Sequence, residues 1–343
     1  MSRTLTSEQI TLSKSLIESA QRVVISTHRS PDGDAIGSAL GLYHALRVLG
    51  KDVQVILTDG APEFLQWIPG YAEVIILEDR PNEVMNVLQG ADLLFVLDYN
   101  QYYRTGEAME TLLQQTRVPV ILIDHHQQPG DFPNVCYSDT SACSTAEMVY
   151  RFLEQLAYKH CIDDACRQAL YCGIMTDSGS FRFPTVSADT HRIAGEMIEA
   201  GLDHAHVHRM VYDTNMMDKL RLVGYALSQK LIVLPEAATA YITLTADELK
   251  QFNYKQGDTE GLVNQALSIQ GVKLAAFFRE GNNEIKASFR SKGSFDVNAY
   301  ARRHWQGGGH INAAGGKSDQ DMTTTIEKFE QLTLQMQDQI AAS

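Results

Sequence analysis

The stretch "VVISTHRSPDGDAIGSALGLYHALRVLG", residues 23–50, decides the fold. A short apolar run leads through a polar turn into a helical pattern, which predicts a strand, a turn and a helix. Three polar side chains, His28, Asp32 and Asp34, lie at the strand end and in the turn. Asp34 could cap a helix that begins at Ala35, and metal binding is the alternative. The choice depends on whether other strands also end in polar residues, because a parallel sheet gathers its ligands at that edge.

Short apolar runs alternate with helical patterns through the first half of the chain. The further apolar runs are "VQVIL" (53–57), "DLLFVLD" (92–98) and "VPVILID" (118–124). Helical patterns continue over residues 144–160, 163–177 and 187–201, where Ser144 or Thr145 can cap the first helix. Runs of Val, Ile and Leu separated by helices predict an α/β fold with a doubly wound parallel sheet.

The second half of the chain follows a different pattern. Residues 203–230 carry only helical periodicity, and strands follow at 231–235 and 239–244. A hairpin is expected over residues 272–291, with Gly281, Asn282 and Asn283 as its turn, and a helix over 321–340 closes the chain. We therefore expect a catalytic domain (1–202), a helical connector (203–230) and a smaller α/β domain with a mixed sheet (231–343). The active site is expected in the cleft between the two domains.

Composition and charge exclude several classes of protein. Of the 343 residues, 29 are Lys or Arg and 42 are Asp or Glu, so the formal net charge is -13. This charge opposes capture of a long nucleic acid or an anionic membrane. No stretch resembles a signal peptide or a membrane span, so the expected location is cytoplasmic. The five cysteines form no CxxC pair, which indicates reduced thiols and no structural zinc site.

Polar residues end further buried elements of the first domain. Asp98 ends one apolar run, Asp124, His125 and His126 follow another, and Asp177 ends a helical pattern. Each has an ordinary explanation as a cap or turn residue, but their joint occurrence favours a shared site. A carboxylate buried without a partner is costly, and metal coordination removes that cost. The predicted ligands are His28, Asp32, Asp34, Asp98, His125 and Asp177, a set that suits two divalent ions such as Mn²⁺ or Mg²⁺.

Four motifs then carry a family resemblance. They are "STHRSPDGDAIGSALGL" (26–42), "DHH" (124–126), "MTDSGSFRF" (175–183) and "GGGHINAAGG" (307–316). In this order they span most of the chain, which resembles the DHH phosphoesterase family with its DHH-associated C-terminal domain. Within this family, the chain most resembles the branch of nanoRNases and 3′-phosphoadenosine-5′-phosphate (pAp) phosphatases.

The resemblance implies a role for each candidate residue of the first domain. His28 and Asp32 would hold one ion, Asp34, His125 and Asp177 the other, and Asp98 would bridge them. His126 would face the scissile phosphate, and Asp124 would orient a ligand imidazole. Two ions are expected in each chain, with Mn²⁺ preferred and Mg²⁺ as the alternative.

The resemblance also assigns a phosphate-gripping loop in the C-terminal domain. Its candidate residues are Ser288, Arg290, Gly307, Gly308, Gly309 and His310. Glycines let a backbone approach an anion closely and present its amides to it. The neighbouring Arg302 and Arg303 could also contribute positive charge to this phosphate-binding loop. Alternatively, they form a solvated helix face.

The expected activity follows from the resemblance and the metal pair. Two bound ions would lower the pKa of a bridging water, and the resulting hydroxide would attack phosphorus. The substrates would be di- to oligoribonucleotides, cleaved to 5′-mononucleotides, together with pAp and linear or cyclic dinucleotides. No continuous basic track fits a long strand or duplex. The alternatives are hydrolysis of pyrophosphate or polyphosphate, and a non-catalytic nucleotide sensor. A homodimer is compatible with the resemblance.

Overall fold

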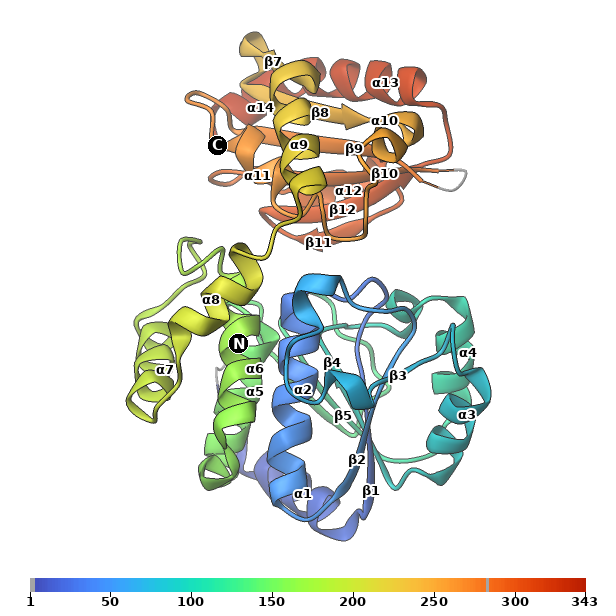
Figure 1. Cartoon of the computed structure of the whole chain (residues 1–343), viewed down its shortest axis with the longest axis vertical. Coiled ribbons are helices and arrows are strands. Elements are labelled where there is room, and N and C mark those ends of the chain that lie inside the picture. Colours follow the sequence, from blue (N-terminus) through green and yellow to red (C-terminus); the bar gives the residue numbers. More distant parts are fainter. Residues whose placement is uncertain (1–3, 282–283) are drawn as a thin grey trace. The chain divides into compact units, whose positions relative to one another are not determined.

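The computed structural model describes residues 4–281 and 284–343, and the chain divides after Thr214 into two compact units. Each unit is built around its own six-stranded sheet (Figure 1). The predicted turn residues Asn282 and Asn283 lie outside the described residues. Within the described ranges, no helix is long and apolar enough to cross a membrane.

The sheet of the first unit is parallel throughout, with the strand order β3-β2-β1-β4-β5-β6. Its strands are β1 (Arg22–Ser26), β2 (Asp52–Leu57), β3 (Ile75–Ile76), β4 (Leu93–Leu97), β5 (Val120–Asp124) and β6 (Val135–Ser138). The predicted doubly wound parallel sheet is thereby confirmed. Sequence patterns missed β3 and β6, because runs of two and four residues are too short to show a period.

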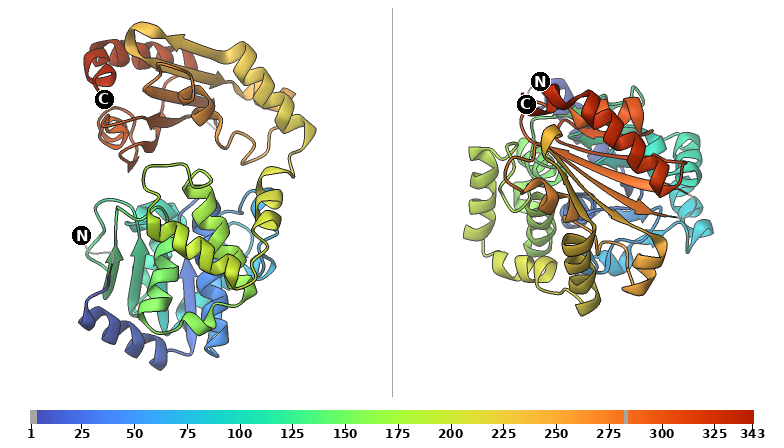
Figure 2. Two further views of the ribbon diagram at one scale, coloured as in Figure 1. Left: turned by 90° about the vertical axis from the view of Figure 1, so that its left-hand side faces the viewer. Right: turned by 90° about the horizontal axis from the view of Figure 1, so that it is seen from above.

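Helices cover both faces of this sheet (Figure 1 and Figure 2). One face packs against α1 (Ser7–Ser19), α2 (Gly33–Val48) and α5 (Thr145–Gln155). On this layer, α6 (Asp164–Asp177) packs against α2 and α5, and α7 (Ala188–Glu199) and α8 (His204–Tyr212) pack against α6, so all six helices share one hydrophobic core. The other face packs against α3 (Pro81–Gly90) and α4 (Glu107–Gln115). Strand β4 illustrates the division, since Phe95 lies in the first core and Leu94 in the second. Such burial on both faces explains the continuous apolar runs.

The turn after β1 differs from the expected cap. Asp32, not Asp34, is the N-cap of α2, and its carboxylate accepts the backbone N–H groups of Asp34 and Ala35. The helix therefore begins one residue before Asp34. Because capping uses Asp32, the buried carboxylate of Asp34 points to other partners.

The second unit has a mixed sheet in the order β11-β12-β10-β9-β8-β7, in which only β8 and β9 pair in parallel. Its strands are β7 (Leu231–Leu234), β8 (Thr239–Leu244), β9 (Leu274–Glu280), β10 (Ile285–Ser291), β11 (Gly308–His310) and β12 (Ala313–Ser318). The smaller α/β domain with a mixed sheet is thus confirmed.

Helices also cover both faces of the second sheet. They are α9 (Met217–Tyr225), α10 (Ala246–Gln251) and α11 (Leu262–Leu267) on one face, and α12 (Val297–His304), α13 (Met322–Gln335) and α14 (Gln337–Ala341) on the other. The single closing helix that was expected is divided at Met336. Met336 leaves helical dihedral angles, and its side chain packs against the core of this unit.

Candidate functional site

The sheet of the first unit reverses its strand order between β1 and β4. In open α/β sheets, ligands bind beyond the carboxyl ends of the strands at such a reversal. Asp98 follows β4 directly, and His28 lies two residues beyond β1. The topology therefore places two of the predicted ligands at the edge where a ligand site is expected.

The six predicted ligands come together in two groups. One group contains His28, Asp32 and Asp98, and the other contains Asp34, His125 and Asp177. Within each group the potential ligand atoms lie within 4.8 Å of one another. The contributing segments are the β1–α2 turn, the first turn of α2, the ends of β4 and β5, and the last residue of α6.

Asp98 faces both groups through different oxygens. Its Oδ2 lies 3.4 Å from His28 Nε2, and its Oδ1 lies 3.5 Å from His125 Nε2. The residue is buried, and its backbone φ of 63° is left-handed, a conformation that Asp tolerates better than most residues. This backbone turns the carboxylate into the space between the two imidazoles.

Both imidazoles are oriented in the same way. Nδ1 of His125 lies 3.3 Å from the carbonyl oxygen of Ala142, and Nδ1 of His28 lies 2.9 Å from that of Arg29. Because a carbonyl oxygen only accepts, Nδ1 carries the proton in each ring and Nε2 is directed at the carboxylates. This backing by a carbonyl group is the usual arrangement of histidine ligands to metals.

The gaps between donor atoms suit a shared cation. Nε2 of His125 lies 3.5 Å from Asp177 Oδ2 and 3.7 Å from Asp34 Oδ2. These distances are long for hydrogen bonds. They lie at or slightly above the roughly 3–3.5 Å that separates ligand atoms around one ion with bonds near 2.1 Å. The donor set of carboxylates and imidazoles fits Mn²⁺ or Mg²⁺.

The N-terminus of α5 holds the carboxylate of Asp34. Its Oδ2 accepts the N–H of Thr145 over 2.6 Å, and its Oδ1 accepts the N–H of Ala146 over 2.8 Å. The first amides of a helix are unpaired donors with a partial positive charge, so they suit an anion. The helix start thereby fixes the orientation of Asp34 within its group.

Burial and mutual charge shift the pKa values of these groups strongly. Burial opposes protonation of His28, but Asp98 and Asp32 raise its pKa to about 9. Burial would raise the pKa of Asp98, but His125 and His28 hold it well below its ordinary value. Burial and the charges of Asp98 and Asp177 raise the pKa of Asp34 well above its ordinary value. The buried carboxylates of this site therefore need positive charge close to them.

Asp124 orients His126, a residue outside the six predicted ligands. Its Oδ1 lies 2.7 Å from Nδ1 of His126, and its Oδ2 accepts the His126 backbone N–H over 3.1 Å. Burial, together with the charges of Arg104 and His125, lowers the pKa of His126 well below its ordinary value. The imidazole is thus held in one orientation, and its Nε2 is the atom directed away from Asp124.

Arg104 is a residue that the sequence patterns did not single out. It lies in the short helical turn Tyr102–Thr105 after β4 and is half-buried. Its positive charge lowers the pKa of both His28 and His126, so the guanidinium lies within electrostatic range of the two groups. No local motif marks it, because an arginine in a turn is most often a solvated surface residue.

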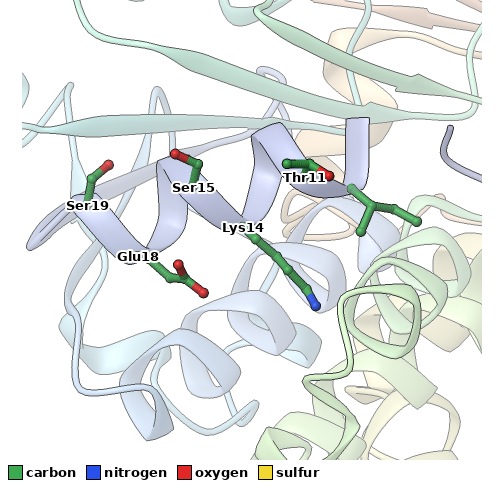
Figure 3. A pocket seen from close by; sticks show the side chains of 6 residues that line it. Thr11, Lys14, Ser15, Glu18 and Ser19 are labelled. Atoms are coloured by element: carbon green, nitrogen blue, oxygen red, sulfur yellow. The ribbon is translucent and has the colours of Figure 1, made fainter. Parts of the chain in front are cut away.

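The surface pocket along α1 is unrelated to this centre. Ile10, Thr11, Lys14, Ser15, Glu18 and Ser19 line it (Figure 3). All six belong to one helix, and none of them is a predicted site residue. The pocket combines one cation and one carboxylate with hydroxyl groups and offers no cluster of ligands.

Four of the candidate phosphate-binding residues of the second unit, Ser288, Arg290, Gly308 and His310, share one face of its sheet. Ser288 of β10 pairs with Gly315 of β12, which pairs with Gly308 of β11. In the next row of that face, Arg290 pairs with Ala313, and Ala313 pairs with His310. Directly paired residues point to the same side of a sheet. Arg290 and His310 therefore stand on either side of a strand with small side chains.

Within the predicted glycine loop, Gly308–His310 form the short edge strand β11. A side chain at Gly307 would collide with the carbonyl of Gly315, and one at Gly309 with the carbonyl of Ala313. The N–H of Gly309 donates to the Asn298 side chain over 2.9 Å. Close packing against β12 thus requires two of the three glycines. The alternative reading of Arg302 and Arg303 as a solvated face agrees with their exposure on α12.

Comparisons with known proteins match both halves of the chain. Residues 22–174 match the DHH family, N-terminal domain, and residues 236–342 match the DHHA1 domain. The chain is similar to the bifunctional oligoribonuclease and PAP phosphatase NrnA of Bacillus subtilis, with 28% identity over 85% of this chain and 88% of the relative.

Two solved structures are similar to this chain in fold. An exopolyphosphatase-related protein from Bacteroides fragilis is 35% identical, with a TM-score of 0.93 over 99% of both chains. RecJ from Thermus thermophilus in complex with Mn²⁺ has a TM-score of 0.55 at 14% identity, over 98% of this chain and 56% of RecJ. The RecJ likeness concerns the fold alone.

Proposed function

Because the chain belongs to the DHH family of phosphoesterases, we propose that it hydrolyses very short RNA to 5′-mononucleotides and dephosphorylates pAp. Two divalent metal ions, Mn²⁺ or Mg²⁺, would assist this hydrolysis. The observation that carries the proposal is Asp98, whose two oxygens face two separate groups of carboxylate and imidazole donors. The similarity to NrnA, which spans most of both chains, supports the choice of substrate.

The mechanism assigns a task to each side chain of the first unit. His28 and Asp32 would hold one ion, Asp34, His125 and Asp177 the other, with Asp98 between them. The bound pair would supply an activated water and neutralise charge on the phosphate. Asp124 holds the His126 imidazole in place, and Nε2 of His126 would contact the phosphate. The negative charge of a phosphate favours the protonated imidazole, which can then donate a hydrogen bond to it.

The second unit would bind the terminal phosphate of the substrate. Arg290 offers a guanidinium that pairs with two phosphate oxygens, and Ser288 and His310 offer further donors on the same face. With a net charge of -13, the chain would attract anionic substrates only through such local groups. Substrates of two to a few nucleotides with a terminal phosphate are therefore expected to be preferred.

Hydrolysis of inorganic polyphosphate is a second candidate. It is favoured by the 35% identity to a protein that is described as exopolyphosphatase-related. A two-ion centre serves either substrate, because both reactions displace a group from phosphorus. A sensor without activity would be expected to lack a ligand, whereas the described residues include all six.

A substrate panel separates these candidates. Purified protein would be incubated with Mn²⁺ and pApA, pAp, pyrophosphate or polyphosphate, and the products would be separated by ion-exchange chromatography. The proposal predicts AMP from pApA and from pAp, with little phosphate from the inorganic substrates. Release of phosphate from polyphosphate alone would favour the second candidate, and a folded, Mn²⁺-bound protein inactive on all four would favour a sensor.

A further inference from the structure

Thr145, the first residue of α5, contacts two carboxylates of the candidate metal centre. Its hydroxyl donates to Asp98 Oδ1 over 2.9 Å, and its backbone N–H donates to Asp34 Oδ2 over 2.6 Å. All three residues are buried, with exposed fractions of 0% for Thr145, 1% for Asp34 and 2% for Asp98. One residue thereby links a carboxylate from each of the two donor groups.

The hydroxyl of Thr145 is available for this contact because a neighbour caps the helix. Ser144 is the N-cap of α5, and its hydroxyl accepts the backbone N–H of Glu147 over 3.0 Å. A Thr side chain has few allowed rotamers, since two heavy atoms branch from its Cβ. Burial and the start of the helix therefore hold the hydroxyl in a fixed position next to Asp98.

The carboxylate of Asp98 needs such an anchor. Rotation about the bond to its carboxyl carbon is soft, so the backbone alone does not decide where each oxygen points. The Thr145 hydroxyl reaches Oδ1, the oxygen that faces His125, and leaves Oδ2 directed at His28. The hydrogen bond thus selects the orientation in which each oxygen serves a different donor group.

We propose that Thr145 is a positioning residue of the metal centre, with its hydroxyl setting the Asp98 carboxylate between the two donor groups. Its backbone N–H and that of Ala146 hold Asp34 at the same time. The inference rests on the proposed function, because it concerns ligands of the proposed metal pair. Loss of an outer hydrogen bond to a metal ligand typically costs about 10–100-fold in metal affinity or activity.

Mn²⁺ binding to the full chain, measured by isothermal titration calorimetry, tests this role. Thr145→Val keeps the shape and the backbone N–H but removes the hydroxyl, and Thr145→Ser keeps the hydroxyl. We expect Thr145→Val to weaken Mn²⁺ binding by about 10–100-fold and Thr145→Ser to bind nearly as the unaltered protein does. The Mn²⁺ concentration for half-maximal hydrolysis of pApA should rise with the Val variant, while KM for pApA stays the same.

Thr190→Val is the matched control. Thr190 is also fully buried, and its hydroxyl donates to a buried carboxylate, Glu147 Oε2, over 2.8 Å. This variant should melt at a lower temperature and keep its Mn²⁺ affinity. An equal loss of affinity in both Val variants would mean general loosening and would overturn the positioning role.

The remaining outcomes also decide the matter. Unchanged Mn²⁺ affinity in Thr145→Val overturns this inference alone, whereas an unaltered protein that binds no Mn²⁺ overturns the proposed function as well. Loss of affinity in Thr145→Ser would assign the effect to the methyl group and contradict the role of the hydroxyl. If Thr145→Val does not fold, Thr145→Ala, which also lacks the hydroxyl and places no methyl group next to Asp98, takes its place with the same expectation.

Discussion

His125 and His126 are adjacent in sequence yet have different surroundings. Nε2 of His125 faces three carboxylates, those of Asp34, Asp98 and Asp177. His126 is held by Asp124 through Nδ1 instead. Their surroundings raise the pKa of His125 and lower that of His126, with burial opposing the first shift and contributing to the second. One imidazole therefore suits a cation ligand, and the other suits contact with the substrate.

The two histidines can be separated by substitution with Asn. We expect His126→Asn to lower kcat for pApA by about 100-fold or more, because one hydrogen-bond donor to the developing charge is lost. Its Mn²⁺ affinity, measured by calorimetry, should change less than that of His125→Asn. If His126→Asn loses Mn²⁺ as completely as His125→Asn does, His126 is a metal ligand and its assignment here is wrong.

At the scale of elements, α2 and α6 pack closely enough to exclude a single methyl group. A Cβ at Gly37 would lie 2.5 Å from the carbonyl oxygen of Ala169 and 2.7 Å from the backbone nitrogen of Gly173. Asp34 lies at the start of α2, and Asp177 lies at the end of α6. The contact between the two helices therefore sets the distance between two predicted ligands.

Gly37→Ala should destabilise the protein, because overpacking of a buried helix contact typically costs about 1–3 kcal/mol. Gly195→Ala in α7 is the matched control, since a Cβ there meets no atom within 4 Å. The control should stabilise the protein by about 0.5–1 kcal/mol through helix propensity. Urea denaturation of both variants measures this, and equal stability of the two would contradict the proposed packing.

A second prediction at this scale concerns acid stability of the second unit. Burial opposes ionisation of Glu248, but Lys230, the N–H of Thr245 and the hydroxyl of Tyr225 outweigh it and lower its pKa to about 2. A lowered pKa stabilises the fold above the ordinary Glu pKa of 4.5, and this contribution is lost as the pH falls toward 2.

The contribution of Glu248 is about 3 kcal/mol at most. We expect Glu248→Gln to lower the free energy of unfolding near pH 6 and to flatten its decline between pH 4.5 and pH 2. Urea titrations at a series of pH values, with folding followed by circular dichroism, check this. A variant with the same decline as the unaltered protein would show that other carboxyl groups dominate acid unfolding.

These elements also show what a sequence can predict here. Long runs such as Leu93–Leu97 are recognisable because every residue is apolar, and their polar ends mark the site. The contact between Asp34 and Thr145 joins residues 111 positions apart, so no local pattern reveals it. A run of glycines resembles a loop in the sequence. Gly307 and Gly309 are required because their backbones pack closely against β12, and no local pattern reveals that contact either.

At the scale of the whole molecule, the net charge bears on which substrates the proposed function allows. The formal net charge is -13. The proposal gives only two basic side chains of the second unit, Arg290 and His310, a role in substrate binding. Binding of long strands requires a track of many cations, because each contacted phosphate is neutralised by one. The proposed function therefore implies a preference for short chains.

A series of 5′-labelled oligoadenylates of two to twenty nucleotides tests that preference. We expect kcat/KM to be highest for two to four nucleotides and to fall with length, with the products resolved on denaturing gels. Equal rates at all lengths would contradict the proposed recognition of a terminal phosphate and point to a processive nuclease.

The most direct test of the two-ion centre is release of AMP from pApA by the unaltered protein and by Asp98→Asn, with and without Mn²⁺. Asn tolerates the left-handed backbone of residue 98, so we expect the substitution to change the ligand without straining the backbone. We predict Mn²⁺-dependent AMP release by the unaltered protein, and at least ~100-fold slower release by an Asp98→Asn variant with an unchanged circular dichroism spectrum. Equal rates for the two proteins, or release that does not depend on a divalent ion, would contradict a metal-assisted centre organised around Asp98.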